Sequence, residues 1–254
     1  MVRDVVGVDR GPSGAGINMS KGKVVDSVIV NVTEGMSGGS PVTGTALTMS
    51  GGTADRVVIT NCQSTGTTAI DAPGSVVSIT GGTLRNSLIA DCDGSHSAPV
   101  YIGSGVTAEN CSVVGNVNSE MNAKTGDFTY NHCGGAVVAS GATVVNTIFA
   151  DNISMFAGNV ESNLYCSVNV PFDHCLIADR AEQAGEGNVF KHPKFNRKAG
   201  DWRLRTSSPG VDQGKVLDWM DEATDLKGTP RIQGAAPDIG CHEDFVHGLM
   251  LMVR

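Results

Sequence analysis

Three aspartates place carboxylates at equivalent points of a repeated motif. Asp91, Asp151 and Asp179 each occupy the sixth position of a seven-residue segment related to NTIFADN, residues 146–152. Paired carboxylates serve as acid, base or nucleophile in glycoside hydrolysis. In polysaccharide lyases, carboxylates hold Ca²⁺ and a basic residue removes the proton. These three are therefore the catalytic candidates. The same position holds asparagine or glycine in the other copies, so a structural role at a turn is the alternative.

Aromatic side chains and one histidine in two long segments form a second candidate set. Segments 117–135 and 152–173 interrupt the repeats, and such loops often form the binding surface of a repeat protein. Aromatic rings offer large apolar faces on which sugar rings can stack. The candidates for ligand binding are Phe128, Tyr130, His132, Phe156 and Tyr165. Packing within the loops is the alternative role for these rings.

The elements that position these residues follow from the repeat. The related segments begin at positions 26, 56, 86, 110, 146 and 174, which are 24 to 36 residues apart. The fourth position, which includes Ile59 and Ile89, is always large and apolar, and the second is always small. Both are expected to face inward, because alternate residues share one face of a strand. The sixth position is Asn, Asp or Gly, which favour turns. Each segment therefore predicts a short strand that ends at a corner.

A second strand with a glycine-rich corner precedes each of these segments. Residues 16–22, 46–52 and 76–82 begin 30 residues apart and show this pattern most clearly. Short strands joined by Gly and Asn corners at this period, without helical segments, are typical of a parallel β-helix. We predict an all-β fold, a parallel β-helix (solenoid) of about six coils over residues 1–180. Residues 181–254 would form a C-terminal capping segment packed on the same solenoid.

Composition and charge exclude some classes of partner. The chain has 254 residues and a formal net charge of −8, and its basic residues do not cluster before residue 180. We expect no nucleic-acid partner, since such proteins need a positive face. The charge also disfavours a strongly anionic polymer, unless a local basic groove is present. No segment approaches the roughly 18 apolar residues of a membrane span, and the first residues lack the apolar core of a signal peptide.

The seven cysteines do not suggest a metal site. They include no CxxC pair and no Cys/His spacing that suits zinc. Their odd number prevents complete internal pairing, and several occupy repeat positions, so we favour buried thiols over a disulfide framework. Cys62 and Cys92 share the seventh position of their repeats and are expected to stack. We expect no cofactor, with Ca²⁺ bound by carboxylates as the alternative.

Aspartates in the C-terminal part lie near glycine-containing turns. Asp212, Asp225 and Asp238 are expected to cap these turns by accepting hydrogen bonds from backbone N–H groups. Arg203 and Arg231 are their expected ion-pair partners. Closing the end of the solenoid is the expected role of this part of the chain, and a calcium or ligand site is the alternative.

Four short motifs in the C-terminal part carry a resemblance to a known family. In chain order they are DWRL at 201–204, SSPGVDQG at 207–214, DLKGTPRI at 225–232 and PDIGCHE at 237–243. This order resembles the choice-of-anchor Q domain proteins, which are secreted bacterial proteins. The preceding repeats resemble right-handed parallel β-helix repeats of the polymorphic outer-membrane-protein type. Cys241 and His242 depart from the Ala-Tyr usual in that family, and the family's export signal and sorting anchor are absent.

The resemblance implies a right-handed β-helix that is extracellular or attached to the cell surface. It implies no catalytic residues in the C-terminal block. The function expected from it, together with the loop aromatics, is binding of polysaccharide, a cell-surface glycan or another extracellular surface. One alternative is a polysaccharide lyase or glycoside hydrolase with a carboxylate cluster on one face of the solenoid. A second is a structural stalk or passenger segment of a larger surface protein.

Overall fold

The computed structural model describes residues 1–3, 6–9, 16–36, 43–65, 74–95, 97–119, 133–155, 158–196 and 200–244. Within those ranges the regular structure is strand, apart from one short 3-10 helix, η2 (Asp218–Met220). The predicted all-β fold is thereby confirmed. No helix in this part of the chain is long and apolar enough to cross a membrane.

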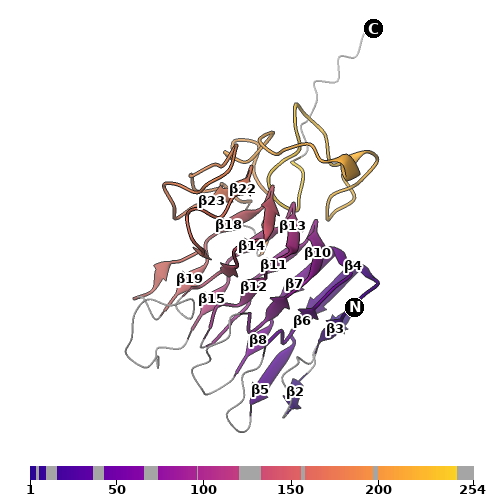
Figure 1. The fold of residues 1–254 in the computed structure, drawn as a ribbon, viewed down its shortest axis with the longest axis vertical. Helices are drawn as coiled ribbons and strands as arrows, with labels where there is room; N and C mark the ends of the chain where they lie inside the picture. The colour runs from indigo at the N-terminus through magenta and orange to yellow at the C-terminus, as the bar shows by residue number, and fades with distance from the viewer. Residues whose placement is uncertain are drawn as a thin grey trace.

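The largest sheet contains two parallel rows of strands (Figure 1). The long strands β4 (Lys23–Val30) and β7 (Thr53–Thr60) contribute to both rows, and β1 (Val2–Arg3) pairs with β4. The first row continues with β10 (Gly82–Arg85), β13 (Val106–Glu109), β17 (Thr143–Val145) and β22 (Phe172–Asp173). The second row consists of repeated seven-residue segments: β11 (Leu88–Ala90), β14 (Ser112–Val114), β18 (Ile148–Ala150) and β23 (Leu176–Ile177).

Three smaller sheets complete the repeats. The glycine-rich segments form a parallel sheet in the order β21 (Leu164–Tyr165), β16 (Ala136–Val138), β12 (Val100–Ile102), β9 (Val77–Ile79), β6 (Leu47–Met49), β3 (Ile17–Met19). The other two are β2 (Val6–Asp9), β5 (Thr33–Met36), β8 (Gln63–Ser64), and β15 (Val117–Asn118), β19 (Ile153–Ser154), β20 (Val160–Glu161). Only β19 and β20 pair antiparallel among these named strands. Successive repeats therefore stack in parallel, whereas the right hand and the closure of the coil stay predictions.

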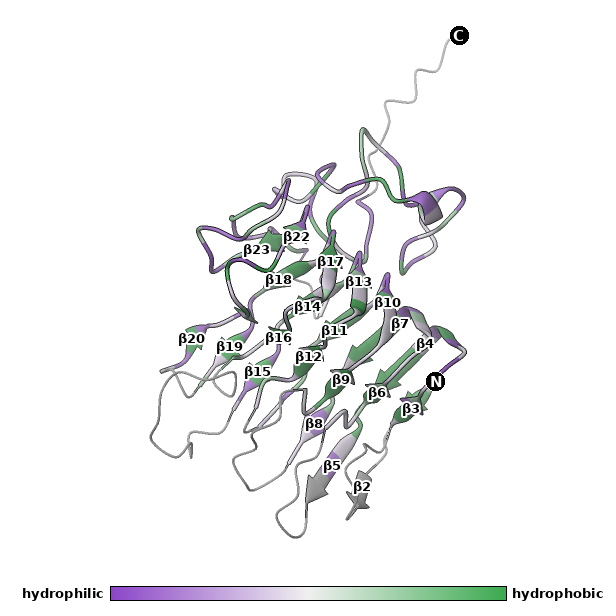
Figure 2. Cartoon of the chain, viewed as in Figure 1, coloured by the Kyte–Doolittle hydropathy of each residue, from purple (hydrophilic) through white to green (hydrophobic). Residues whose placement is uncertain are grey.

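The inward register predicted for the seven-residue segments is confirmed. Ile59 of β7 pairs in parallel with Ile89 of β11, and both side chains are 0% exposed. The same ladder continues through Val113 and Phe149 to Ile177 inside one apolar core. In Figure 2 this core appears as hydrophobic colour along the stacked strands. Each rung covers its neighbours, which is why the segment must recur.

Each seven-residue segment begins and, in five of six repeats, ends at a left-handed corner. The first-position residues have φ between 49° and 53° in all six repeats, and the sixth-position residues have φ between 52° and 65° in the first five. Asn, Asp and Gly adopt this conformation most readily, which explains their recurrence at the sixth position. Arg56 and His174 adopt it at the first position, where the sequence pattern did not indicate a corner.

The outer face of the later strands is covered by residues 191–244, here named the covering segment. This segment contributes Phe195, Leu204, Ile239 and Cys241 to a second buried apolar cluster. The strands contribute third- and fifth-position residues to it, namely Leu88, Ala90, Val114, Ile148, Ala150 and Leu176. These positions are therefore apolar because they face a second core.

Residues 183–189 add one more rung before the covering segment begins. The N–H of Phe172 in β22 donates to the carbonyl oxygen of Ala184 at 2.8 Å, and Val189 bridges Leu176 of β23 in parallel. This rung lies beyond the last named strands, at the end of the stack where a cap was expected. The covering segment itself lies along the side of the stack.

A buried asparagine fastens the covering segment to the strands. The side chain of Asn146 accepts the N–H of Lys215 at 2.7 Å and donates to its carbonyl oxygen at 2.8 Å. The backbone carbonyl of Asn146 accepts the N–H of Gly240 at 2.8 Å. Asn146 is 0% exposed, so these bonds satisfy groups that no water reaches.

Asp225 forms one of the predicted turn caps in the covering segment, whereas Asp238 binds N–H groups farther along the chain. Asp225 Oδ1 accepts the N–H groups of Lys227 and Thr229, both at 2.8 Å. Asp238 accepts the N–H of Asp212 at 2.8 Å and that of Asp244 at 2.6 Å.

The arginine partners differ from the prediction. Arg203 donates to Asp201 at 2.8 Å, and the fully buried Arg231 pairs with Glu243 at 3.0 Å. Asp201 therefore balances the charge of Arg203, and Glu243 is the partner of Arg231, instead of the predicted aspartates.

The cysteines are free thiols, as predicted. Six of the seven are buried and Cys166 is half-buried. Cys62 and Cys92 make the same contact one rung apart, since each Sγ lies 3.8 Å from the carbonyl oxygen of a fourth-position residue, Ile29 and Ile59 respectively. They fill equivalent places in the core.

Candidate functional site

A groove runs along the sixth-position corner of four successive repeats. Asn61, Asp91, Gly115 and Asp151 line one wall. The opposite wall comes from the covering segment at residues 200–202, and the groove has a volume of about 660 Å³. Three strand spacings of about 4.8 Å make this row of corners roughly 14 Å long. Three of these four corners carry a polar side chain, and the remaining one is Gly115.

The indole of Trp202 forms the main apolar surface of the groove. Its six-membered ring occupies the space that a side chain at position 115 would need, so only glycine admits it there. The ring also packs edge to face on Phe195, with centroids 5.2 Å apart and planes at 88°. Trp202 Nε1 donates to Asp91 Oδ2 at 3.1 Å. These contacts fix the indole against the wall of corners.

Asp91 has an altered acidity. Burial raises the pKa of its carboxyl, and the hydrogen bond from the Trp202 indole partly opposes the rise. A carboxyl of this kind retains a proton at higher pH than an ordinary aspartate, as a general acid requires.

Asp151 belongs to a cluster with Glu161 and His192. His192 Nε2 lies 2.9 Å from Asp151 Oδ1 and 3.7 Å from Glu161 Oε1, and one ligand atom from each residue lies within 4.8 Å of the others. The N–H of Asp151 donates to Glu161 Oε1 at 2.8 Å. Two carboxylates and an imidazole could hold a divalent cation, and the nitrogen ligand suits zinc or another transition metal better than Ca²⁺. An ion pair with a protonated imidazole is the alternative.

Asp179 has a different role from the other two catalytic candidates. Its Oδ2 accepts the N–H of Asn163 at 2.8 Å, which ties this corner to the residue before β21. Asp91 and Asp151 line the groove, and Asp179 is not among its lining residues. The structure thus brings two of the three predicted carboxylates to one site.

The aromatic candidates do not contribute to the groove as far as they are described. Phe128, Tyr130, His132 and Phe156 lie outside the described residues. Tyr165 lies in β21 and is 43% exposed, but it does not line the groove.

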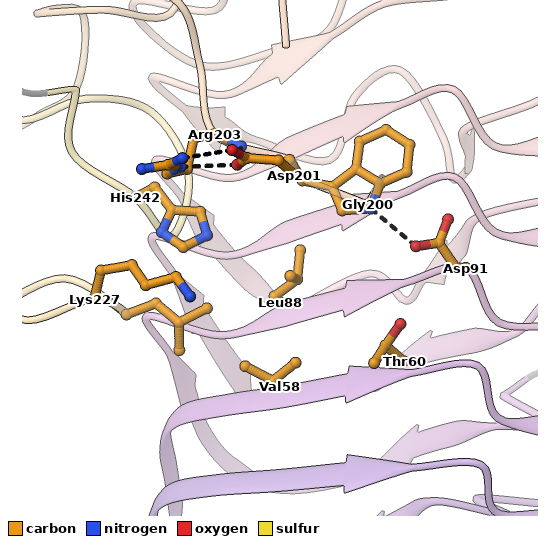
Figure 3. Close-up of a pocket in the computed structure, with 11 residues that line it drawn as sticks. Val58, Thr60, Leu88, Asp91, Gly200, Asp201, Arg203, Lys227 and His242 are labelled. Atoms are coloured by element: carbon orange, nitrogen blue, oxygen red, sulfur yellow. Dashed lines mark hydrogen bonds and ion pairs between the residues drawn. The ribbon is translucent and has the colours of Figure 1, made fainter. Parts of the chain in front are cut away.

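Figure 3 shows a second hollow, with a volume of about 490 Å³. Both are lined by Asp91 and by residues 200–202. The floor of the second hollow includes Val58 and Leu88 of the outer strand face, and one side consists of Lys227 and His242. The hollow therefore lies where the covering segment stops covering the strands.

Sequence reasoning missed the residues that the covering segment brings to the site. Trp202 lies 111 positions after its hydrogen-bond partner Asp91, and no periodicity links the two. One signal was present in the repeats. Gly115 interrupts a position that is otherwise Asn or Asp, and such a glycine marks the close approach of another group.

The chain was compared with known protein families, curated proteins and solved structures. No family model, no curated protein and no solved structure matches it.

Proposed function

We propose that this protein is a secreted or cell-surface parallel β-helix protein that binds polysaccharide in the groove beside Trp202. Membership of the choice-of-anchor Q group and the right hand of the coil are parts of the same proposal, and they rest on the motif order described above. The single observation that carries the binding function is the composition of the groove. Three of the four corners along one wall carry polar side chains, and an indole packs against that wall.

This arrangement suits an extended sugar chain. Sugar hydroxyl groups donate hydrogen bonds to carboxylate oxygens such as those of Asp91 and Asp151. The apolar face of a sugar ring can pack on an indole, which loses little conformational entropy because Phe195 and the corner at Gly115 already hold it. The groove follows the stacking direction, so a polymer can lie along it without bending.

Isothermal titration with soluble fragments of several neutral and acidic polysaccharides tests this function. We expect at least one fragment to bind, and Trp202→Ala to weaken its Kd by about tenfold or more, or roughly 1.4 kcal/mol. Tyr165→Ala is the matched control, because it removes an exposed aromatic ring outside the groove. Equal binding by wild type and Trp202→Ala, with both folded by thermal melting, would rule out this groove.

A second candidate function is hydrolysis or elimination of the sugar chain within the same groove. The raised pKa of the Asp91 carboxyl favours it. Asp91 and Asp151 are separated by one repeat, so their backbones are roughly 10 Å apart. Inverting glycosidases place an acid and a base carboxyl about 6.5–9.5 Å apart. In this reading Asp91 protonates the leaving oxygen and Asp151 activates water.

Release of new reducing ends or of unsaturated sugar products from the bound polysaccharide distinguishes this candidate from binding alone. Asp91→Asn is expected to abolish release while the fragment still binds. Binding without release, over a range of pH, would leave the protein a binding protein.

A further inference from the structure

The hollow beside Lys227 has a different charge from the rest of the groove. Asn61, Asp91 and Asp151 make the first hollow neutral to acidic along its corner wall. The second hollow instead has Lys227 and His242 on one side, opposite Asp91 (Figure 3). The first hollow is thus lined by carboxylates without a basic side chain, whereas the second is also lined by Arg203, Lys227 and His242.

Lys227 is the available cation at this end. Its side chain is exposed, and among the described residues no carboxylate pairs with its ammonium group. Arg203 also lines the hollow, but Asp201 neutralises it through hydrogen bonds that include one of 2.8 Å. An incoming anion would therefore meet the Lys227 ammonium without displacing another acid.

His242 lies on the same side, but the neighbouring Asp225 carboxylate and Cys241 sulfur match any positive charge on its ring. It is 6% exposed, and its Nδ1 makes no hydrogen bond within the described structure. Asp225 Oδ2 is the nearest carboxylate oxygen to that nitrogen, but at 3.8 Å it is too distant for a hydrogen bond. Burial lowers the pKa of His242, but the adjacent Cys241 sulfur and the Asp225 carboxylate outweigh this and raise it to about 9.

We propose that the Lys227 end of the groove binds an anionic substituent of a sugar, the carboxylate of a uronic acid, while the neighbouring sugar packs on Trp202. This inference rests on the proposed glycan-binding function and adds the chemical class of the ligand. The Lys227 ammonium supplies the positive charge that a carboxylate requires, and the His242 ring lies on the same side. The acidic end of the groove repels a second carboxylate, so the orientation of the bound chain is fixed.

The whole protein limits how anionic the ligand can be. A formal net charge of −8 repels a polymer that carries a negative charge on every residue. The acidic corner wall adds to this repulsion at close range. We therefore expect a preference for chains in which a uronic acid lies next to neutral sugars.

The test compares matched oligosaccharides that differ at a single sugar, a uronic acid in one and the corresponding neutral hexose in the other. Wild type is expected to bind the acidic member about tenfold more tightly at low salt, and added salt should reduce this ratio. Lys227→Gln should bring the ratio close to one. Lys23→Gln, which removes an exposed lysine on β4, is the matched control and should retain the preference.

The outcomes separate this inference from the function on which it rests. Equal affinity of wild type for both members, or a full preference in Lys227→Gln, would overturn the uronic acid assignment. The binding function would still stand if Trp202→Ala weakened both members, whereas no binding of either member would remove both proposals. A sulfated analogue is the third arm: tight binding of the sulfated sugar alone would overturn the carboxylate in favour of sulfate.

Discussion

The early and late strands of the second row present the same sequence pattern to different surroundings. Val28 of β4 and Val58 of β7 point outward and are half-buried, whereas Val114 of β14 and Ile148 of β18 are 0% and 1% exposed. The difference arises because the second core is built on the later repeats, and Val58 only borders it. A single repeated segment can thus present either a surface or a second core.

The candidate site lies at the border between these two regions. Val58 is only partly covered, Leu88 is buried, and both line the hollow beside Lys227. The groove therefore forms at the edge of the area that the covering segment packs against. Disturbing the cover should expose the later strands and leave the early strands as they are.

The largest effect is expected for loss of the Arg231 side chain. Arg231→Ala leaves the buried Glu243 carboxyl without its partner, and breaking a buried pair of this kind costs about 3–5 kcal/mol. Hydrogen exchange should rise in β14 and β18 and remain unchanged in β4. Arg205→Ala, an exposed arginine of the same segment, is the control and should change stability by less than about 0.5 kcal/mol. An equal rise of hydrogen exchange in all strands would contradict the view that the covering segment can come off the later strands without unfolding the early ones.

The next effect compares equivalent third-position residues on covered and uncovered strands. Ile148→Ala removes a side chain that is 1% exposed in the second core and should cost about 2–5 kcal/mol in unfolding free energy. Val28→Ala, on the half-buried early face, should cost less than about 1 kcal/mol. Denaturant unfolding measures both. Similar costs would show that the two outer faces do not differ in burial.

The buried carboxyl of Asp238 should make the stability of the covering segment depend on pH. Burial raises its carboxyl pKa from 3.8 to about 6, although the N–H groups of Asp212 and Asp244 oppose the rise. The folded state thus holds this proton more tightly than the unfolded state does. The stabilisation that the protonated Asp238 contributes is complete below pH 3.8 and is lost as pH rises through 6. The loss is on the order of 3 kcal/mol. Asp238→Asn should flatten this part of the curve of unfolding free energy against pH, and an unchanged slope would contradict it.

The smallest effect is expected at an uncovered corner. Asp26 and Arg56 form an ion pair of 2.6 Å, but the Asp26 side chain is 67% exposed. Asp26→Asn should therefore reduce the unfolding free energy by less than about 1 kcal/mol, and salt should erase the difference. A cost above about 2 kcal/mol would show that early corners are as constrained as covered ones.

The inner face could be predicted from the sequence because it depends on the repeat alone. Ile59 and Ile89 occupy the same position of adjacent repeats, and parallel stacking places them together without information from elsewhere. The left-handed corners at Asn61 and Asp91 were predictable for the same reason.

The outer face and most of the site could not be predicted in this way. The apolar character of Val114 and Ile148 was visible, but nothing in the repeat says what covers them. Likewise, Trp202 and Lys227 reach the groove through packing of a distant, non-repetitive segment. Asp179 binds the N–H of Asn163, whereas Asp91 and Asp151 line the groove, and residue type at the shared repeat position does not distinguish these places.

The most direct test of the account uses Trp202 as its own reporter. The chain has two tryptophans, and Trp219 lies apart from the groove in η2, beneath the Arg85 guanidinium at 4.7 Å. In a Trp219→Phe protein, titration with the tightest-binding oligosaccharide should shift and saturate the Trp202 emission at the Kd found by calorimetry. Acrylamide quenching of Trp202 should fall in parallel. Calorimetric binding with unchanged emission and quenching would place the sugar elsewhere and contradict the account.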